Sequence, residues 1–227
     1  MTQERVLVIA AHPDDEVLGC GGTIAWHAAR GDQVHVAIMA QGLFSRGTPA
    51  EAEQQALRTA CETANGILGV TSLECFDLPD NRLDSLDLLD IVQKVEALVQ
   101  RYQPGIVYGH WSGDVNIDHR LLHEVVVTAC RPQPGHPVHT LLFFEVASST
   151  EWQVPHSAPA FLPNWFSDIS QTLDTKLRAL EAYAMEMRAW PHPRSVRALE
   201  HLARWRGATV GVEAAEAFVL GRRLNFQ

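Results

Sequence analysis

The stretch V-L-V-I-A-A-H-P-D-D-E, residues 6–16, decides the fold, because an apolar run passes directly into an imidazole and three carboxylates. Val6 to Ile9 has the unbroken apolar character of a strand that is buried on both faces of a parallel sheet. Such a sheet gathers the carboxyl ends of its strands at one edge, where ligands bind. The segment from His12 to Glu16 is therefore predicted to be a metal-binding or catalytic loop.

The spacing within this loop suits two chemical roles. His12 and Asp15 can give a nitrogen and an oxygen to one divalent cation, while Asp14 points another way in the turn and stays available as a base. Alternatively, Asp14, Asp15 and Glu16 only cap the next helix, because carboxylates satisfy the free N–H groups and the dipole at a helix N-terminus. Capping accounts for the acids but not for His12, so this loop alone leaves both interpretations open.

Length and composition favour one α/β domain over residues 1–227, with 46% apolar residues to build its core. The formal charge of −9 argues against nucleic-acid or anionic membrane partners, which select surfaces rich in Lys and Arg. The four cysteines are scattered without a C-x-x-C pair, so reduced thiols are expected rather than a thiolate zinc site. No signal-peptide pattern and no bilayer-long apolar run is found, which predicts a cytoplasmic protein without membrane insertion.

The rest of the chain alternates strand and helix patterns. Strands are predicted at 34–39, 72–76, 105–109 and 140–145, with a closing edge strand at 217–224, and helices at 17–30, 49–68, 86–101, 121–130 and 173–190, with one more ending at 206. We expect an α/β, Rossmann-like, mostly parallel sheet with helices on both faces, strand order 3-2-1-4-5 and an additional C-terminal strand.

Three glycines at the start of the first helix raise a nucleotide-binding alternative. A glycine-rich turn after the first strand holds a pyrophosphate in dinucleotide-binding folds. The order Gly19-x-Gly21-Gly22 is not G-x-G-x-x-G, however, and the acidic loop stands where the phosphates would lie. Close packing of the helix on the sheet is the better interpretation.

A second polar cluster, H-W-S-G-D-V-N-I-D-H at 110–119, follows the fourth predicted strand. In the expected order, strands one and four are neighbours, so His12 and Asp15 should lie opposite His119. Two histidines and one carboxylate with an open fourth position form the ligand set of a hydrolytic zinc site. We therefore predict one divalent metal per chain, zinc or alternatively iron(II).

Other loops at this edge provide candidates for substrate contacts. Arg46 lies in a polar loop, and Asp80 lies in a turn, where it could equally be an ordinary turn residue. Arg58 shares a helix face with Glu62, so a surface ion pair is its alternative role. His192, in the segment P-H-P-R-S, is a further candidate and could instead be a surface or packing histidine.

Residues 146–170 form a long stretch that is rich in proline and aromatic residues. Stretches of this length without regular structure usually serve as lids or binding loops. The alternative is packing over the sheet edge or a contact between subunits. We accordingly expect a lid or an oligomer-contact loop, and a homo-oligomer.

The motif AHPDDE at 11–16, with a later D-H, resembles the PIG-L/LmbE-like N-acetylglucosamine deacetylases, which are metal-dependent amidohydrolases with a Rossmann-like fold. The resemblance covers most of the chain; its weaker signatures are L-R with a later E at 57–62, L-P-D at 78–80 and A-E-A-F at 215–218. It implies that His12, Asp15 and His119 bind zinc, that Asp14 is the general base and that Arg58 contacts the sugar. Asp118, in the D-H pair, joins the catalytic candidates.

One position departs from the family pattern. Members with the second motif H-x-D-H carry a histidine that polarises the oxyanion, and Asn116 takes that place here. An amide N–H can stabilise an oxyanion but cannot deliver a proton, so Asp14 or another acid must protonate the departing amine. His110 and His192 are spare imidazoles for that role, and each could instead be a surface or packing histidine.

The sequence thus predicts a zinc-dependent hydrolase that removes the N-acetyl group from a small N-acetylglucosamine-type amino sugar or its conjugate. Two alternatives stay open. The first is a metal-dependent amidase acting on another N-acyl substrate, and the second is a non-catalytic binding or scaffold protein with the same fold.

Overall fold

The computed structural model describes residues 3–44 and 47–225. Its strands are β1 (Arg5–Ala10), β2 (Gln33–Ala40), β3 (Ser72–Leu78), β4 (Ile106–His110), β5 (Thr140–Phe144), β6 (Trp165–Asp168) and β7 (Ala215–Arg223). Its α-helices are α1 (Asp15–Ala29), α2 (Glu51–Leu68), α3 (Leu88–Tyr102), α4 (Ile117–Ala129), α5 (Leu173–Ala182) and α6 (Val196–Ala208), and its short 3₁₀ helices are η2 (Leu83–Ser85) and η3 (Thr150–Trp152).

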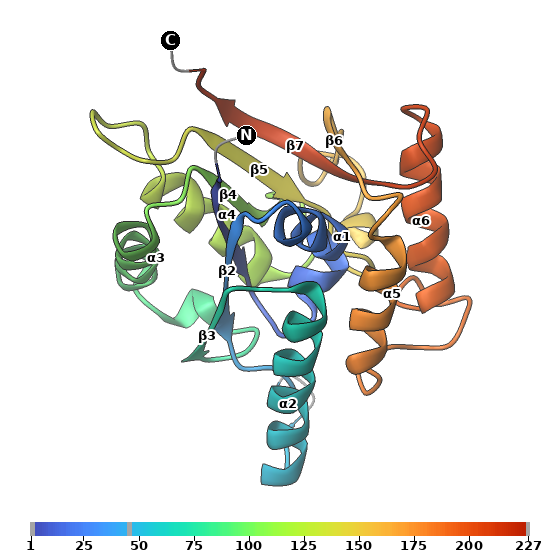
Figure 1. Cartoon of the computed structure of the whole chain (residues 1–227). Helices are drawn as coiled ribbons and strands as arrows, with labels where there is room; N and C mark the ends of the chain where they lie inside the picture. The colour runs from blue at the N-terminus through green and yellow to red at the C-terminus, as the bar shows by residue number, and fades with distance from the viewer. Residues whose placement is uncertain (1–2, 45–46, 226–227) are drawn as a thin grey trace.

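These strands form one sheet with the order β3-β2-β1-β4-β5-β7-β6 (Figure 1). The first five strands pair in parallel, and β7 pairs antiparallel with both β5 and β6. The predicted order 3-2-1-4-5 is confirmed. The C-terminal strand was predicted to be an edge strand, but it lies inside the sheet because β6 pairs along its outer side.

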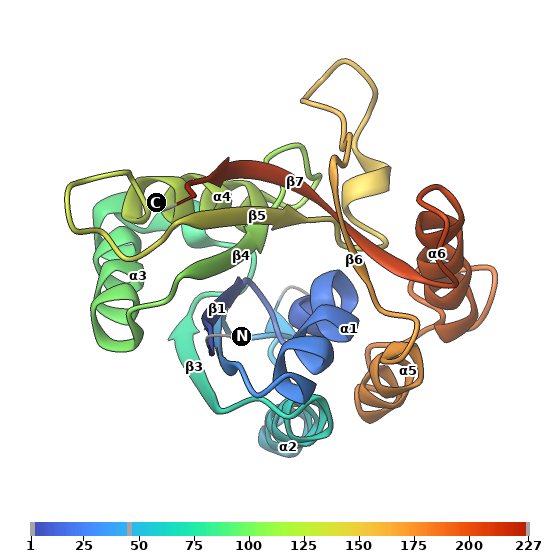
Figure 2. The same ribbon diagram turned by 45° about the horizontal axis from the view of Figure 1, so that its top comes forward.

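The alternation of side chains along β1 explains why the helices divide into two layers. Val6 and Val8 point into a core that includes buried residues of α1, α2, α5 and α6. Leu7 and Ile9 point into the opposite core, which includes buried residues of α3 and α4. Figure 2 shows these layers on the two sides of the sheet. A strand covered on both faces needs no polar side chain, which is why the run is unbroken.

The glycines of α1 permit the close helix packing that the sequence predicted. A Cβ at Gly19 would overlap the ring of Phe144, and one at Gly22 would lie 2.7 Å from Ile169. α1 also bends at Cys20, whose backbone is non-helical. The carboxylate of Glu216, on β7, accepts hydrogen bonds from the N–H groups of Gly22 and Thr23 and so caps the second half of the helix.

Three predicted elements differ from the structure. The helix predicted at 173–190 ends at Ala182, and the chain then continues through turns that include two prolines. α4 begins at Ile117 rather than 121, because the Asn116 side chain caps it by accepting the Asp118 N–H. The stretch 146–170 is not structureless, since it contains η3 and β6.

Among residues 3–44 and 47–225, no helix is long and apolar enough to cross a membrane.

Candidate active site

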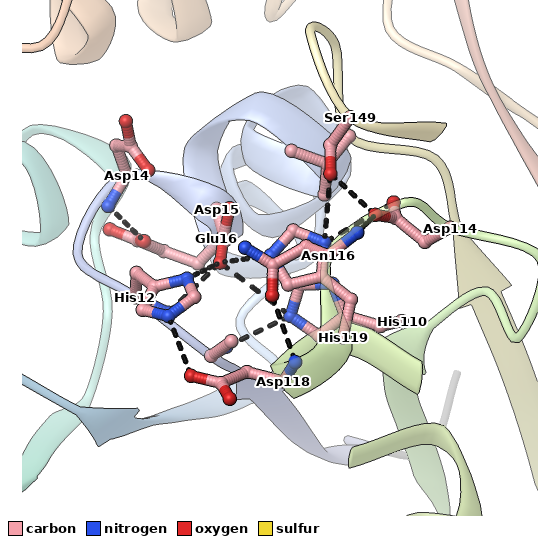
Figure 3. Close-up of polar contacts among 12 residues, drawn as sticks. His12, Asp14, Asp15, Glu16, His110, Asp114, Asn116, Asp118, His119 and Ser149 are labelled. Carbon is pink, nitrogen blue, oxygen red and sulfur yellow. Dashed lines mark hydrogen bonds and ion pairs between the residues drawn. The ribbon is translucent and has the colours of Figure 1, made fainter. Parts of the chain in front are cut away.

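A cavity of about 370 Å³ opens at the carboxyl ends of β1 and β4, where the sequence predicted the site. It is lined by His12, Pro13, Asp14, Asp15, Gly42, Leu43, Leu57, Asp80, Asn81, Val115, Asn116, His119, Ser148, Ser149, Trp152, Glu186 and Arg194. The two predicted clusters meet there, because the loop after β1 faces the start of α4 (Figure 3).

His12, Asp15 and His119 form the first of two groups whose ligand atoms are close enough to share a metal ion. Oδ2 of Asp15 lies 3.2 Å from Nδ1 of His12 and 3.2 Å from Nε2 of His119. Tetrahedral zinc with bonds of about 2.0–2.1 Å separates its ligands by roughly 3.3 Å. No described group makes a hydrogen bond with the buried Nε2 of His119. The donor types, the spacing and this nitrogen, which makes no hydrogen bond to the described residues, all fit a zinc ion.

Each of these imidazoles contacts a carboxylate through its other nitrogen. Nε2 of His12 lies 3.0 Å from Asp118, and Nδ1 of His119 lies 3.2 Å from Asp114. A carboxylate in that position fixes the tautomer and leaves the opposite nitrogen free for a metal. The second possible metal group, His12 with Asp80 and Asp118, is therefore less suitable, because Asp118 already accepts the N–H groups of Asn81 and Leu83.

The electrostatics of the site favour positive charge between the carboxylates. Burial lowers the pKa of His12, but contacts with Asp118 and Asp15 outweigh it and raise the pKa to about 10. For His119, burial is likewise outweighed by Asp15 and Asp114, so that its pKa rises to about 9. Despite burial, the two histidines hold the pKa of Asp15 well below its usual range. A divalent cation would supply the same positive charge.

Asp14 is held beside this group in a special backbone conformation. Its φ of 110° lies in the left-handed region, which a residue other than glycine occupies only when its surroundings impose it. Its side chain makes no capping bond to α1, so helix capping does not explain this acid. Instead, Oδ2 of Asp14 accepts a hydrogen bond of 3.0 Å from Arg194, and its N–H donates to Glu16. Burial raises the pKa of Asp14 well above its usual range, while Arg194 acts in the opposite direction.

Glu16 connects that turn to the helix layer. Its other oxygen accepts hydrogen bonds from the Tyr183 hydroxyl at 2.7 Å and the Asn65 amide at 2.9 Å. Burial raises the pKa of Glu16 to about 7 although these bonds act against the rise. Glu16 therefore positions the backbone of Asp14 and does not line the cavity.

Asn116 lines the cavity, and both ends of its amide have partners. Its oxygen caps α4, and its Nδ2 donates to Asn81 at 2.9 Å. An amide group has two donor hydrogens, so the bond to Asn81 leaves one for a ligand. Asp80 is buried on the same wall, with an oxygen 3.3 Å from Nε2 of His12.

His110 lies behind the candidate metal ligands and does not line the cavity. Its ring stacks on His119 with centroids 4.1 Å apart, and its Nε2 accepts the Ala11 N–H. Burial and the neighbouring His119 hold the pKa of His110 well below its usual range. This neutral, buried ring supports His119 and is badly placed to deliver a proton to a substrate.

The remaining predicted residues lie around the cavity or outside the described residues. Arg58 does not line it; its guanidinium is exposed, 3.9 Å from Asp77, in a neighbouring hollow. His192 is half-buried and packs its ring against Trp152. Arg46 is outside the described residues.

Sequence reasoning gave no role to Asp114, Arg194, Ser149 or Trp152. Asp114 accepts hydrogen bonds from Ser149, Thr150 and the N–H of Asn116 in addition to its contact with His119. A signal was present for Asp114, since it lies in the second polar cluster near His119. Arg194 and Trp152 reach the cavity only through tertiary contacts, which no local pattern reveals.

Comparison with known proteins gives relatives of two kinds. A probable N-acetyl-alpha-D-glucosaminyl L-malate deacetylase 2 of Bacillus cereus is 27% identical over 198 residues, covering 82% of this chain and 86% of the relative. The 4-oxalmesaconate hydratase of Pseudomonas putida is 29% identical over 212 residues, covering 84% of this chain and 77% of the relative.

Among solved structures, a conserved protein of Thermus thermophilus superposes with a TM-score of 0.77 at 27% identity, over 99% of this chain and 98% of that one. The sequence model described as PIG-L, GlcNAc-PI de-N-acetylase, matches residues 7–130, which include every residue of the metal group and Asp14. Since that match spans more than half of the 227 residues, the chain belongs to the PIG-L family.

Proposed function

We propose that this protein is a zinc-dependent hydrolase that removes the N-acetyl group from an N-acetylglucosamine-type amino sugar or its conjugate. The observation that carries the proposal is the group His12, Asp15 and His119, with the buried carboxylate of Asp14 beside it in the same cavity. Two neutral imidazoles and one carboxylate with an open position are the ligand set of hydrolytic zinc sites.

The residues divide the work of amide hydrolysis. A zinc ion held by His12, Asp15 and His119 would supply the Lewis acidity that polarises an amide carbonyl and acidifies water. Asp14 accepts the proton of the attacking water, a role favoured by the burial that raises its pKa. Asn116 donates its free amide hydrogen to the oxyanion that forms at the carbonyl. Asp118 keeps His12 oriented, and the protonated Asp14 returns its proton to the departing amine.

The charge of the cavity favours a neutral sugar as the substrate over a molecule with several carboxylates. Among the described lining residues, Arg194 is the only Lys or Arg, and it is paired with Asp14. Asp15, Asp80 and Glu186 add further negative charge. A substrate with several carboxylates, such as the hydratase relative's name indicates for that protein, would meet repulsion here.

The other sequence predictions complete the proposal. Arg58, Asp80, Arg46 and His192 contribute to substrate recognition, and residues 146–170 form a lid or a subunit contact in a homo-oligomer. The protein acts in the cytoplasm, with iron(II) as the alternative metal.

The test measures acetate and free amine together. Purified protein, with its metal content determined, is incubated with N-acetylglucosamine, with its glycosides and with matched N-formyl and N-propionyl sugars. We expect acetate and amine in equal amounts from an N-acetyl sugar. Asp14→Asn should retain the metal and lose roughly 10²–10⁴-fold in rate. Turnover of 4-oxalmesaconate without any amide hydrolysis would contradict the proposal.

A further inference from the structure

Trp152 is a large aromatic side chain at the rim of the cavity. It lines the cavity although 52% of its surface is exposed. The metal ligands at the floor are far less exposed, with His119 and Asp15 at 2% and 1%. An acetamide that reaches the metal group must therefore lie deep in the cavity, with its sugar ring above it. Whatever the sugar carries at its glycosidic position then lies near the rim.

The segment that carries the indole is anchored to Asp114, and the ring itself packs against His192. In this segment, Thr150 donates a hydrogen bond of 2.7 Å to Asp114, and Gln153 donates one of 3.1 Å to the Asp114 carbonyl oxygen. The ring of His192 packs nearly perpendicular to the indole, at 79° with centroids 5.6 Å apart. Because Asp114 also contacts His119, the same carboxylate fixes the position of Trp152 relative to the metal ligands.

We propose that Trp152 forms a subsite for a cyclic polyol, a second pyranose or a cyclitol, joined to the N-acetylated sugar. This inference rests on the proposed deacetylase function. One face of such a ring presents C–H bonds with a small positive charge, which pack against the negative face of an indole. Stacking also removes apolar surface of the exposed indole from water. Val115, 47% exposed on the same cavity, extends this apolar rim.

The charge of the cavity points to a neutral ring in this subsite. The lining carboxylates Asp80 and Glu186 disfavour an acidic aglycone. An acyclic, charged aglycone such as malate offers neither a ring face to the indole nor a charge suited to these acids. The subsite therefore selects by ring shape and neutrality.

The experiment compares three aglycones on the same N-acetylglucosamine: a second pyranose in N,N′-diacetylchitobiose, an inositol and a malate. Trp152→Ala should raise KM roughly tenfold for the two ring conjugates, as expected when on the order of 50 Å² of apolar contact is lost, and leave kcat almost unchanged. KM for the malate conjugate should stay unaltered. The ratio of wild-type kcat/KM for the two ring conjugates identifies whether the pyranose or the cyclitol is preferred.

Two variants separate stacking from mere space filling. Trp152→Phe should recover most of the wild-type KM because it keeps an aromatic face, whereas Trp152→Leu should not. Trp205→Ala is the matched control: this tryptophan is 65% exposed on α6 and does not line the cavity. Binding without turnover gives a second readout. Calorimetric titration of N,N′-diacetylchitobiose into Asp14→Asn should show roughly tenfold weaker affinity when Trp152→Ala is added.

The possible failures are distinguishable. If the wild type releases acetate but Trp152→Ala changes KM equally for all three conjugates, or for none, the subsite is refuted while the deacetylase function stands. An altered oligomeric state of Trp152→Ala in light scattering, with KM unchanged, would assign the indole to a subunit contact instead. Absence of acetate from every conjugate would overturn the proposed function and this inference with it.

Discussion

Arg194 and Asp14 are 180 residues apart in the sequence, yet Nη1 of Arg194 donates a hydrogen bond of 3.0 Å to Oδ2 of Asp14. Nε of the same guanidinium donates to Ser148, and Glu186 lies 3.9 Å away. A buried carboxylate that loses its cation is strongly destabilised, because its charge is no longer compensated. Arg194 thus favours the charged form of Asp14, against the effect of burial, and orients its carboxylate.

Replacing this arginine should therefore impair turnover without removing metal. We expect Arg194→Met to lower kcat/KM for the N-acetylated sugar roughly 10–100-fold, the usual cost of losing a partner that orients an active-site group. The kcat/KM of Arg194→Lys should lie between those of the wild type and Arg194→Met, because lysine keeps the charge but cannot donate to both Asp14 and Ser148 in the geometry of a guanidinium. Arg204→Met, which removes an exposed arginine from α6, is the control. If Arg194→Met is as active as the control Arg204→Met, the function of Asp14 does not depend on Arg194.

Asp114 should control metal affinity through His119. Asp114→Asn keeps the shape of the side chain but weakens the contact with Nδ1 of His119, so we expect metal to bind roughly 10–100-fold more weakly. His119→Ala should abolish binding. Competition with a zinc-sensitive dye measures both affinities on protein stripped by a chelator. Stoichiometric metal in a double His12→Ala, His119→Ala variant would disprove the ligand set.

Asn116 has a capping role and a proposed catalytic role, and these can be separated. Asn116→Ser keeps an oxygen that can cap α4 but removes the amide donor. We expect it to stay nearly as stable as the wild type and to lose about 10²–10³-fold in kcat. Asn116→Ala should lose both the cap of α4 and the amide donor, so that its unfolding free energy is lower by about 1 kcal/mol. Asn116→His should be more active than either. Full activity of the serine variant would reduce Asn116 to a helix cap.

Arg58 tests whether substrate extends beyond the cavity. The hollow that it lines shares Pro13, Gly42 and Leu57 with the cavity, so a bound conjugate that crosses this wall would reach its guanidinium. Arg58→Ala should then raise KM, by roughly tenfold for one charged hydrogen bond, with metal content unchanged. Identical kinetics of wild type and variant would leave only the exposed pair with Asp77.

His27 lies outside the candidate active site and should make the unfolding free energy depend on pH. Its ring lies between Asp32 and Tyr108, beside the ring of Trp26, with Arg30 and Glu4 nearby. Burial lowers its pKa although Asp32 opposes this.

At pH values below about 6.5, His27 therefore binds a proton in the unfolded chain but not in the native chain. The unfolding free energy decreases as the pH is lowered through this range. Urea unfolding at pH 7.5 and 5.5 should show a larger loss for the wild type than for His27→Gln. An equal loss would mean that His27 titrates normally in the native state.

The sequence predicted those parts of the fold that local patterns encode. The central order of five strands followed from apolar runs that alternate with amphipathic helices. β6 was missed because its four residues, W-F-S-D, are too few to show a strand pattern and form a strand only by pairing with β7. The metal group was predictable because His12, Asp15 and His119 follow directly after two strands that the topology makes neighbours.

Other parts of the site depend on contacts between distant segments. Arg194 reaches Asp14 because the chain turns after Ala182, and Trp152 reaches the rim because Asp114 binds the segment around η3. The placement of His110 could not be predicted for the same reason. Its position behind His119 follows from burial, which a spare imidazole in a sequence does not reveal. The lid or contact role of residues 146–170 stays a prediction.

The Glu216 carboxylate that caps the bent half of α1 has a consequence for the order of assembly during translation. The loop that carries His12 and Asp15 leaves the ribosome well before Tyr183, Arg194 and Glu216, which hold that loop and its helix. A nascent chain that ends before β7 therefore lacks the acceptor for two buried N–H groups of α1. Completion of the loop that carries His12 and Asp15 is thus coupled to synthesis of β7, and a chain that stops before this strand is not expected to display a complete centre.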